Sequence, residues 1–142
     1  MADYPTKDDC IFCKIVAGDI PAAIIHEDQH LVAFMDAFPS SEGHALVIPR
    51  GHYESVLDLP PELMSTCSLM VQRLAKAART VFSPDGITIL QFNGEAAGQT
   101  VFHYHQHVIP RWAGQSWSAH GKTQGDPELL QRQAAQLRDA LK

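Results

Sequence analysis

The chain has 142 residues, of which 45% are hydrophobic and 19% charged, and its formal net charge is −5 at pH 7. This size and composition predict one globular domain over residues 1–142, and the negative charge argues against nucleic acid as a main partner. No apolar run is long enough to cross a bilayer, and residues 1–9 lack the apolar core of a secretion signal. We therefore expect a cytoplasmic protein without a membrane partner.

The first third of the chain predicts short elements. Residues 1–9 are polar and are expected to form a loose tail, and residues 10–17 predict a short helix that ends at Gly18. Two apolar runs, at 20–27 and 31–34, are separated by polar residues and predict a β-hairpin.

A third strand is predicted at residues 44–50, and a long helix is predicted to begin at Pro60 and Pro61. Apolar residues recur after these prolines at helical spacing, which predicts one buried face. They are Leu63, Cys67, Met70, Val71, Leu74 and Ala78.

The last third of the chain predicts two strands and a closing helix. Residues 87–92 form an apolar, β-branched run, and a turn at 93–98 leads to a strand with three histidines. Residues 112–142 are harder to read, although 127–142 predict an amphipathic helix.

Together these elements predict an α+β fold with about five strands in a mostly antiparallel sheet, one long central helix and a C-terminal helix. Such a sheet leaves an edge strand, so we expect a homodimer.

Three histidines, His103, His105 and His107, alternate with other residues. In a β-strand this spacing sends all three imidazoles to one face. Neutral imidazole is a nucleophile, a general base and a metal ligand, so the row fits either group transfer or metal binding. The isolated His26, His30 and His120 carry no such pattern; we expect ordinary structural or surface histidines.

A glycine-containing turn precedes the histidines. Gly94 and Gly98 permit a tight turn, and Gln99 and Thr100 add an amide and a hydroxyl. Backbone N–H groups in such a turn can bind phosphate oxygens, although Asn-Gly is also an ordinary hairpin turn.

The cysteines are odd in number, which fits a reducing compartment. Cys67 falls within the helical stripe and is expected in the core. Cys10 and Cys13 form a Cys-x-x-Cys pair, which is either redox-active or half of a zinc site; a tetrahedral zinc needs two more ligands.

Residues 103–109 resemble the His-φ-His-φ-His-φ-φ signature of the histidine triad (HIT) superfamily, where φ is apolar, with a departure at the polar Gln106. Further segments are similar to the Hint-like branch in the same order, so that the resemblance covers roughly residues 10–111. These segments are 10–15, 20–22, 34–36, 43–52 and 93–111.

The resemblance implies a nucleotide hydrolase or nucleotidyl transferase that works through a covalent nucleotidyl-histidine. His105 would attack the phosphorus and release a purine nucleoside monophosphate, an AMP or GMP derivative, from phosphoramidate-like substrates. His107, with Gln99 and Thr100, would contact the phosphate and leaving group, and His44 would support the triad.

The resemblance also implies the nucleoside and metal sites. Asp36 would accept from the ribose hydroxyls, Asn93 would contact sugar and phosphate, and Gly98 and Val101 flank the phosphate contacts. The purine slot would be formed by Ile11, Phe12, Ile15 and Phe34, with Ala37 or Phe38. A structural zinc would be held by Cys10, Cys13, His52 and His103.

Two other functions fit the same residues. One is hydrolysis of dinucleoside polyphosphates, and the other is a zinc-stabilised nucleotide-binding module with vestigial activity. A binding module needs no aligned nucleophile, so the second is disfavoured by the joint presence of His44, His103, His105, His107, Gln99 and Thr100.

Overall fold

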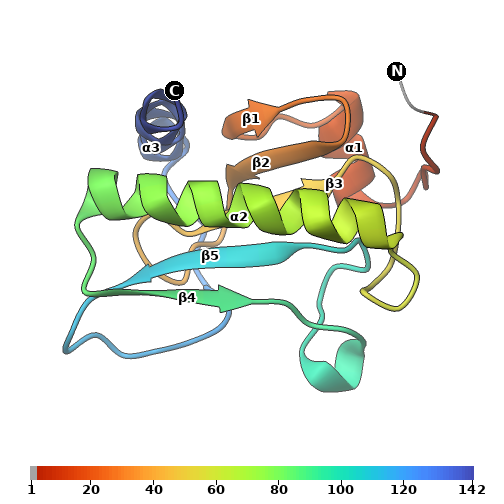
Figure 1. Cartoon of the computed structure of the whole chain (residues 1–142). Helices are drawn as coiled ribbons and strands as arrows, with labels where there is room; N and C mark the ends of the chain where they lie inside the picture. The colour runs from red at the N-terminus through yellow and green to blue at the C-terminus, as the bar shows by residue number, and fades with distance from the viewer. Residues whose placement is uncertain (1–2) are drawn as a thin grey trace.

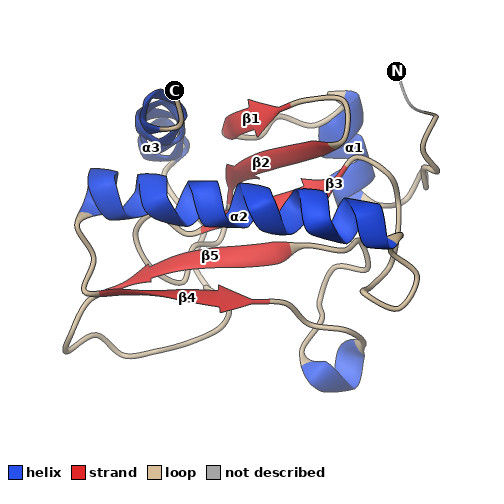
Figure 2. Ribbon diagram, in the orientation of Figure 1, coloured by secondary structure: helices blue, strands red, loops and turns tan. Residues whose placement is uncertain are grey.

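Five antiparallel strands form one sheet in the order β1-β2-β3-β5-β4, and three α-helices complete the α+β fold (Figure 1, Figure 2). The computed structural model describes residues 3–142. The strands are β1 (Ile24–Glu27), β2 (Leu31–Met35), β3 (Ala45–Pro49), β4 (Gly86–Leu90) and β5 (Gln106–Arg111). The helices are α1 (Ile11–Ala17), α2 (Pro61–Phe82), α3 (Pro127–Ala140) and the 3₁₀ helix η1 (Glu95–Ala97). These elements confirm the predicted fold class.

The central strands β2, β3 and β5 are buried on both faces of the sheet, whereas the edge strand β4 is partly exposed. On one face Ala33 and Met35 join the apolar stripes of α2 and α3 in a core that also contains Cys67. On the other face Val32 and Phe34 pack with the residues of α1. Successive residues of β2 thus enter different cores, as strand geometry requires. Figure 1 shows α2 lying across the sheet.

The histidine row begins before its strand, which corrects the prediction that all three histidines lie in one strand. β5 starts at Gln106, because the chain before it turns away and Tyr104 donates its backbone N–H to Tyr53 O at 2.6 Å. Successive side chains before the strand nevertheless still point to opposite faces of the sheet. The Tyr104 and Gln106 side chains point toward α2, where Gln106 Nε2 donates to Tyr104 Oη at 2.7 Å and to Ser68 Oγ at 3.3 Å.

The polar N-terminal segment is anchored rather than loose. Tyr4 Oη lies 2.7 Å from His30 Nδ1, and Pro5 O accepts from the backbone N–H of His52 at 2.7 Å. Met1 and Ala2, which the predicted tail also included, lie outside the described residues.

The segment between β5 and α3 crosses the end of β2. Gly125 donates its backbone N–H to Ala37 O at 2.8 Å. Gly121 packs so closely that a Cβ added there would lie 2.3 Å from the carbonyl oxygens of Phe38 and Pro39. These contacts fix the course of the segment before α3 begins at Pro127.

Among the helices of residues 3–142, none has both the length and the apolar character that a membrane span requires.

Candidate functional site

A cavity of about 630 Å³ lies between α1, the end of β2, the approach to β5 and the segment before α3. That volume is typical of small-molecule sites. Ten residues from the predicted substrate and catalytic set line it together: Ile11, Phe12, Ile15, Phe34, Asp36, Ala37, Thr100, Val101, His105 and His107. The structure thus brings these ten residues together around one cavity.

Three other predicted substrate contacts instead hold the turn between β4 and β5. Gln99 Oε1 accepts from Gly94 N at 2.7 Å, and Gln99 Nε2 donates to the backbone oxygens of Glu54 and Val101 at 2.6 and 3.0 Å. Asn93 Oδ1 accepts from Val56 N at 2.7 Å. These amides, and the backbone of Gly98, shape the turn from outside the cavity lining.

A chain of hydrogen bonds assigns the tautomers of His44 and His107. The Ser40 backbone N–H donates to His44 Nδ1 at 3.0 Å, so His44 carries its proton on Nε2. His44 Nε2 lies 2.9 Å from His107 Nδ1 and therefore donates to it. His107 consequently carries its own proton on Nε2, which is buried without a hydrogen-bond partner among the described residues. An unpaired N–H thus belongs to a cavity-lining side chain.

His105 has the opposite tautomer. Its Nδ1 lies 2.7 Å from the backbone oxygen of His103, which can only accept, so Nδ1 carries the proton and Nε2 carries a lone pair. The His105 and His107 rings are 4.9 Å apart between centroids. Two neighbouring rings therefore have opposite tautomers, with a lone pair on Nε2 of His105 and an unpaired N–H on Nε2 of His107.

Burial keeps these imidazoles neutral. Desolvation lowers the pKa of His44 to about 3 and that of His107 to about 2, and it also lowers the pKa of His105. A neutral His105 retains the Nε2 lone pair at neutral pH, as a nucleophile requires.

Asp36 lies at the end of β2 beside this network. Its Oδ1 accepts from Phe38 N at 2.9 Å, and its Oδ2 lies 3.4 Å from His44 Nε2. Desolvation by burial raises its pKa, so hydrogen-bond donors from a ligand would stabilise the carboxylate.

The apolar end of the cavity is formed by α1 and β2. Phe12 packs edge-on against Phe34 at 5.5 Å and against His105 at 5.1 Å between ring centroids. Ile11, although half exposed, and Ile15 extend this wall along α1. A flat, apolar ligand group suits such a slot.

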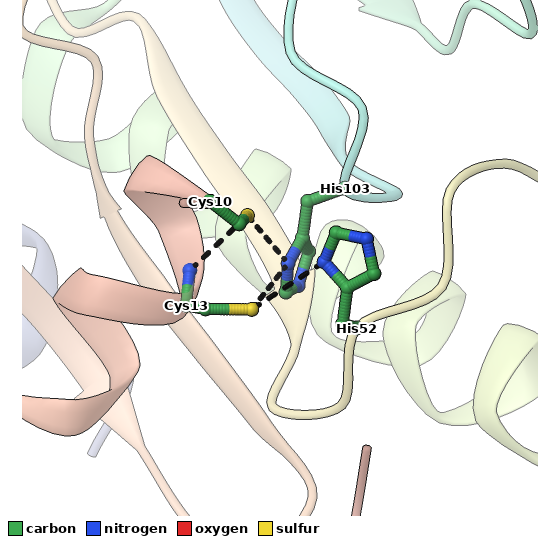
Figure 3. Close-up of side chains that lie close together, drawn as sticks. All are labelled: Cys10, Cys13, His52 and His103. Atoms are coloured by element: carbon green, nitrogen blue, oxygen red, sulfur yellow. Dashed lines mark hydrogen bonds between the residues drawn. The ribbon is translucent and has the colours of Figure 1, made fainter. Parts of the chain in front are cut away.

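A cluster of four possible metal ligands lies at the start of α1 and is formed by Cys10, Cys13, His52 and His103 (Figure 3). His103 Nδ1 lies 3.5 Å from Cys10 Sγ and 3.6 Å from Cys13 Sγ, and His52 Nδ1 lies 3.4 Å from Cys13 Sγ. His103 Nε2 donates to Pro49 O at 2.8 Å, which leaves the Nδ1 lone pair directed at the sulfurs.

This cluster fits a tetrahedral zinc. Zinc bonds of about 2.3 Å to sulfur and about 2.0 Å to nitrogen place tetrahedral S and N ligands about 3.5 Å apart, close to the spacing found here. The bond from His103 to Pro49 O is the kind of support that metal-bound histidines have. A second group of possible metal ligands consists of Asp36, His44 and His107. Its two histidines are close together because they are hydrogen-bonded to each other.

His120 is a cavity residue that sequence reasoning missed. It lies on the irregular segment after β5, lines the cavity and packs 5.7 Å from the His107 ring. No periodicity marks it, because a long-range fold-back brings it to the site. His26 and His30 lie elsewhere, beside Asp28 and Tyr4 respectively.

Comparisons with known proteins agree with this geometry. The family model described as HIT domain matches residues 17–114. The protein named Protein hit from Bacillus subtilis is 48% identical over 128 residues, which cover 87% of this chain and 88% of that protein. Adenylylsulfatase HINT3 from Arabidopsis thaliana is 34% identical over 137 residues, 92% of this chain and 66% of that protein.

A solved structure of a protein with bound zinc supports the fold. The crystal structure of a Zn-bound histidine triad family protein from Mycobacterium smegmatis matches with a TM-score of 0.82 and 40% identity, covering 94% of this chain and 93% of that one. The chain therefore belongs to the HIT family and has the fold of its members.

Proposed function

We propose that the protein is a nucleotide hydrolase that releases a purine nucleoside monophosphate from phosphoramidate-like substrates through a covalent nucleotidyl-histidine. One observation carries this proposal: His105, with a lone pair on Nε2, and His107, with an unpaired N–H on Nε2, are neighbouring rings that line one cavity. Family membership and the named activity of the Arabidopsis relative support it.

The reaction proceeds in two displacements. In the first, His105 Nε2 forms a bond to the phosphorus, the bond to the leaving group breaks, and its electron pair goes to the leaving atom. An amine leaving group takes a proton from solvent. In the second, water oxygen bonds to the phosphorus, the P–Nε2 bond breaks with its electron pair returning to His105, and the water proton passes to solvent.

The neighbouring groups stabilise charge and hold the nucleoside. His107 Nε2–H donates to a phosphoryl oxygen as negative charge develops there, and the Thr100 hydroxyl lines the same region. Asp36 accepts from the ribose hydroxyls, and Phe12 and Phe34 enclose the purine. The same arrangement accepts other nucleophiles in place of water, which gives nucleotidyl transfer.

The charge of the cavity favours phosphoramidate-like substrates over dinucleoside polyphosphates. No lysine or arginine is among the residues found to line it, and Asp36 is negative when ionised. A polyphosphate chain would bring several negative charges without a fixed cation to balance them. The opposite tautomers of His105 and His107 also argue against a module that only binds nucleotides.

The Cys10, Cys13, His52 and His103 cluster would hold a structural zinc. A bound zinc would fix the start of α1, and thus the purine slot, to the segment that carries His105. We also place the protein in the cytoplasm, because Cys10, Cys13 and Cys67 form no disulfide.

A second copy of the chain is the partner that we propose for β4. This strand lies at the edge of the sheet, where a second strand could pair with it. Its Ile89 side chain is half exposed, and a hollow of about 300 Å³ lies next to it between β4 and α2. Light scattering at micromolar concentration tests this; a monomer would contradict it.

Turnover of adenosine phosphoramidate by the wild type and two variants tests the proposed activity. His105→Ala should lose at least about 10³-fold in kcat, whereas His26→Ala, which changes a histidine on β1, should keep wild-type activity. Circular dichroism checks that both variants fold. Equal activity of the three proteins would refute the assignment of His105.

A further inference from the structure

The residues that precede α1 lie against the cluster of four possible metal ligands. Pro5 O accepts the backbone N–H of His52 at 2.7 Å, and Lys7 O accepts that of Cys10 at 3.2 Å. His52 belongs to the loop after β3, and Cys10 caps the start of α1. One short segment, residues 4–7, is therefore hydrogen-bonded to two of the four residues that would hold zinc.

Tyr4 fixes the position of this segment at its other end. Its hydroxyl lies 2.7 Å from His30 Nδ1, in the turn between β1 and β2. Gly51 lies directly against the segment, because a Cβ added there would lie 3.0 Å from Tyr4 Cβ and 3.3 Å from Pro5 Cδ. The stretch of chain that leads from β3 to His52 is thus packed against residues 4 and 5.

His52 is the most accessible of the four ligands. Cys10, Cys13 and His103 are 8%, 7% and 0% exposed, whereas His52 is only partly buried. A metal that leaves the folded protein therefore leaves on the His52 side, since the other three side chains are buried. The hydrogen bond to Pro5 O opposes the loop movement that would withdraw the His52 imidazole from the cluster.

We propose that residues 4–7 are positioning residues for the metal: they hold the backbone of His52 beside the cysteine pair and so set the rate at which zinc leaves the folded protein. The inference rests on the zinc site proposed above and adds the segment that retains the metal. Groups that support metal ligands from behind typically change metal affinity about 10- to 100-fold when they are removed.

The rate of zinc release from the wild type and its variants tests the proposal. Zinc-loaded protein is mixed with excess 4-(2-pyridylazo)resorcinol at neutral pH, and the absorbance of the chelate follows release. Deletion of residues 1–6 removes Tyr4 and Pro5 and should speed release about 10- to 100-fold. Tyr4→Ala should speed it less, because Pro5 O remains in the chain. A chain that begins at Tyr4 keeps both contacts and should release zinc at the wild-type rate.

A core variant separates local movement of His52 from a loss of overall stability. Leu137→Ala creates a cavity beneath α3, in the core that does not contain the cysteine pair. It should lower the urea midpoint yet release zinc at the wild-type rate. Cobalt bound in place of zinc gives a spectroscopic signature of its ligand geometry. Its visible absorption bands should change in the deletion variant and stay unchanged in Leu137→Ala.

The outcomes distinguish this inference from the zinc site itself. Zinc release at the wild-type rate in both the deletion variant and Tyr4→Ala would overturn the role of residues 4–7 alone. Equal acceleration by the deletion and by Leu137→Ala would do the same, because release would then follow overall stability. A wild-type protein that binds no zinc would overturn both proposals, whatever its hydrolase activity.

Discussion

His44 Nε2 donates to His107 Nδ1 across 2.9 Å, and both rings are almost completely buried. The bond sets the tautomer of His107, because a nitrogen that accepts from His44 cannot also carry the proton. His107, which lines the cavity, is thereby left with an unpaired N–H on Nε2, and the Ser40 backbone fixes the tautomer of His44. His44 acts on the reaction through His107 and is a positioning residue.

Removal of this bond should impair turnover more than binding. His44→Ala frees His107 to place its proton on either nitrogen, so the donor to the phosphoryl group is lost for part of the population. We expect kcat to fall about 10- to 100-fold with KM changed less than about 3-fold. Steady-state kinetics with His26→Ala as control measure this, and an unchanged kcat would contradict the tautomer assignment.

The buried imidazoles also predict the pH dependence of stability. Burial lowers the pKa of His44 to about 3 and of His107 to about 2, below the usual 6.5 that applies in the unfolded chain. At a pH between the folded and unfolded pKa values, the unfolded chain binds more protons than the folded chain. The free energy of unfolding is therefore highest above pH 6.5 and falls as the pH drops below it.

From pH 7 to pH 5 the free energy of unfolding should decrease by on the order of 2–4 kcal/mol from these two groups. Urea unfolding at the two pH values, with zinc present throughout, measures the change. The double variant His44→Asn and His107→Asn lacks both titrating groups and should show a shallower dependence. Equal slopes for the two proteins would contradict the prediction.

Helices whose buried face or end is marked by nearby residues could be predicted from the sequence. The stripe from Leu63 to Ala78 predicted the buried face of α2, and Gly18 marked the end of α1 with a left-handed backbone, φ +82°. Both features depend on neighbours within one helix. The apolar cavity residues were found because the segments that carry them match a family.

Other features depended on contacts distant in sequence. The chain leaves the strand before Gln106 because Tyr104 bonds to Tyr53, which the alternation of histidines does not reveal. His120 reaches the cavity through a segment with no periodicity, held at Gly121 and Gly125. The hydrogen bonds of Gln99 to Glu54 and Gly94 could likewise not be predicted. The sequence does not indicate whether a side-chain amide binds the protein backbone or a ligand.

The carboxylate of Asp36 should discriminate between ribose and its deoxy analogues. Asp36→Asn should raise KM about 10-fold for an adenosine substrate, because the amide accepts less strongly from the hydroxyls. The 2′,3′-dideoxy analogue lacks these donors, so the variant and the wild type should have similar KM values for it. An equal increase with both substrates would show that Asp36 acts on the fold rather than on ribose.

Zinc should bind at one site per chain and stabilise the fold. Metal analysis should find about one zinc in the wild type and in Cys67→Ala, and much less in Cys10→Ala, because Cys67 lies in the core opposite α1. Chelation should lower Tm by several degrees in the two zinc-binding proteins but little in Cys10→Ala. Equal zinc content in all three would exclude this cluster as the site.

The covalent intermediate is the central claim, and mass spectrometry of the quenched enzyme tests it most directly. Wild-type protein mixed with adenosine phosphoramidate should be denatured at alkaline pH within milliseconds, because a P–N bond to histidine hydrolyses in acid. We expect one adenylyl group per chain on the peptide that contains His105, and none in His105→Ala. Rapid turnover by the wild type with no adduct, or an adduct that persists in His105→Ala, would contradict it.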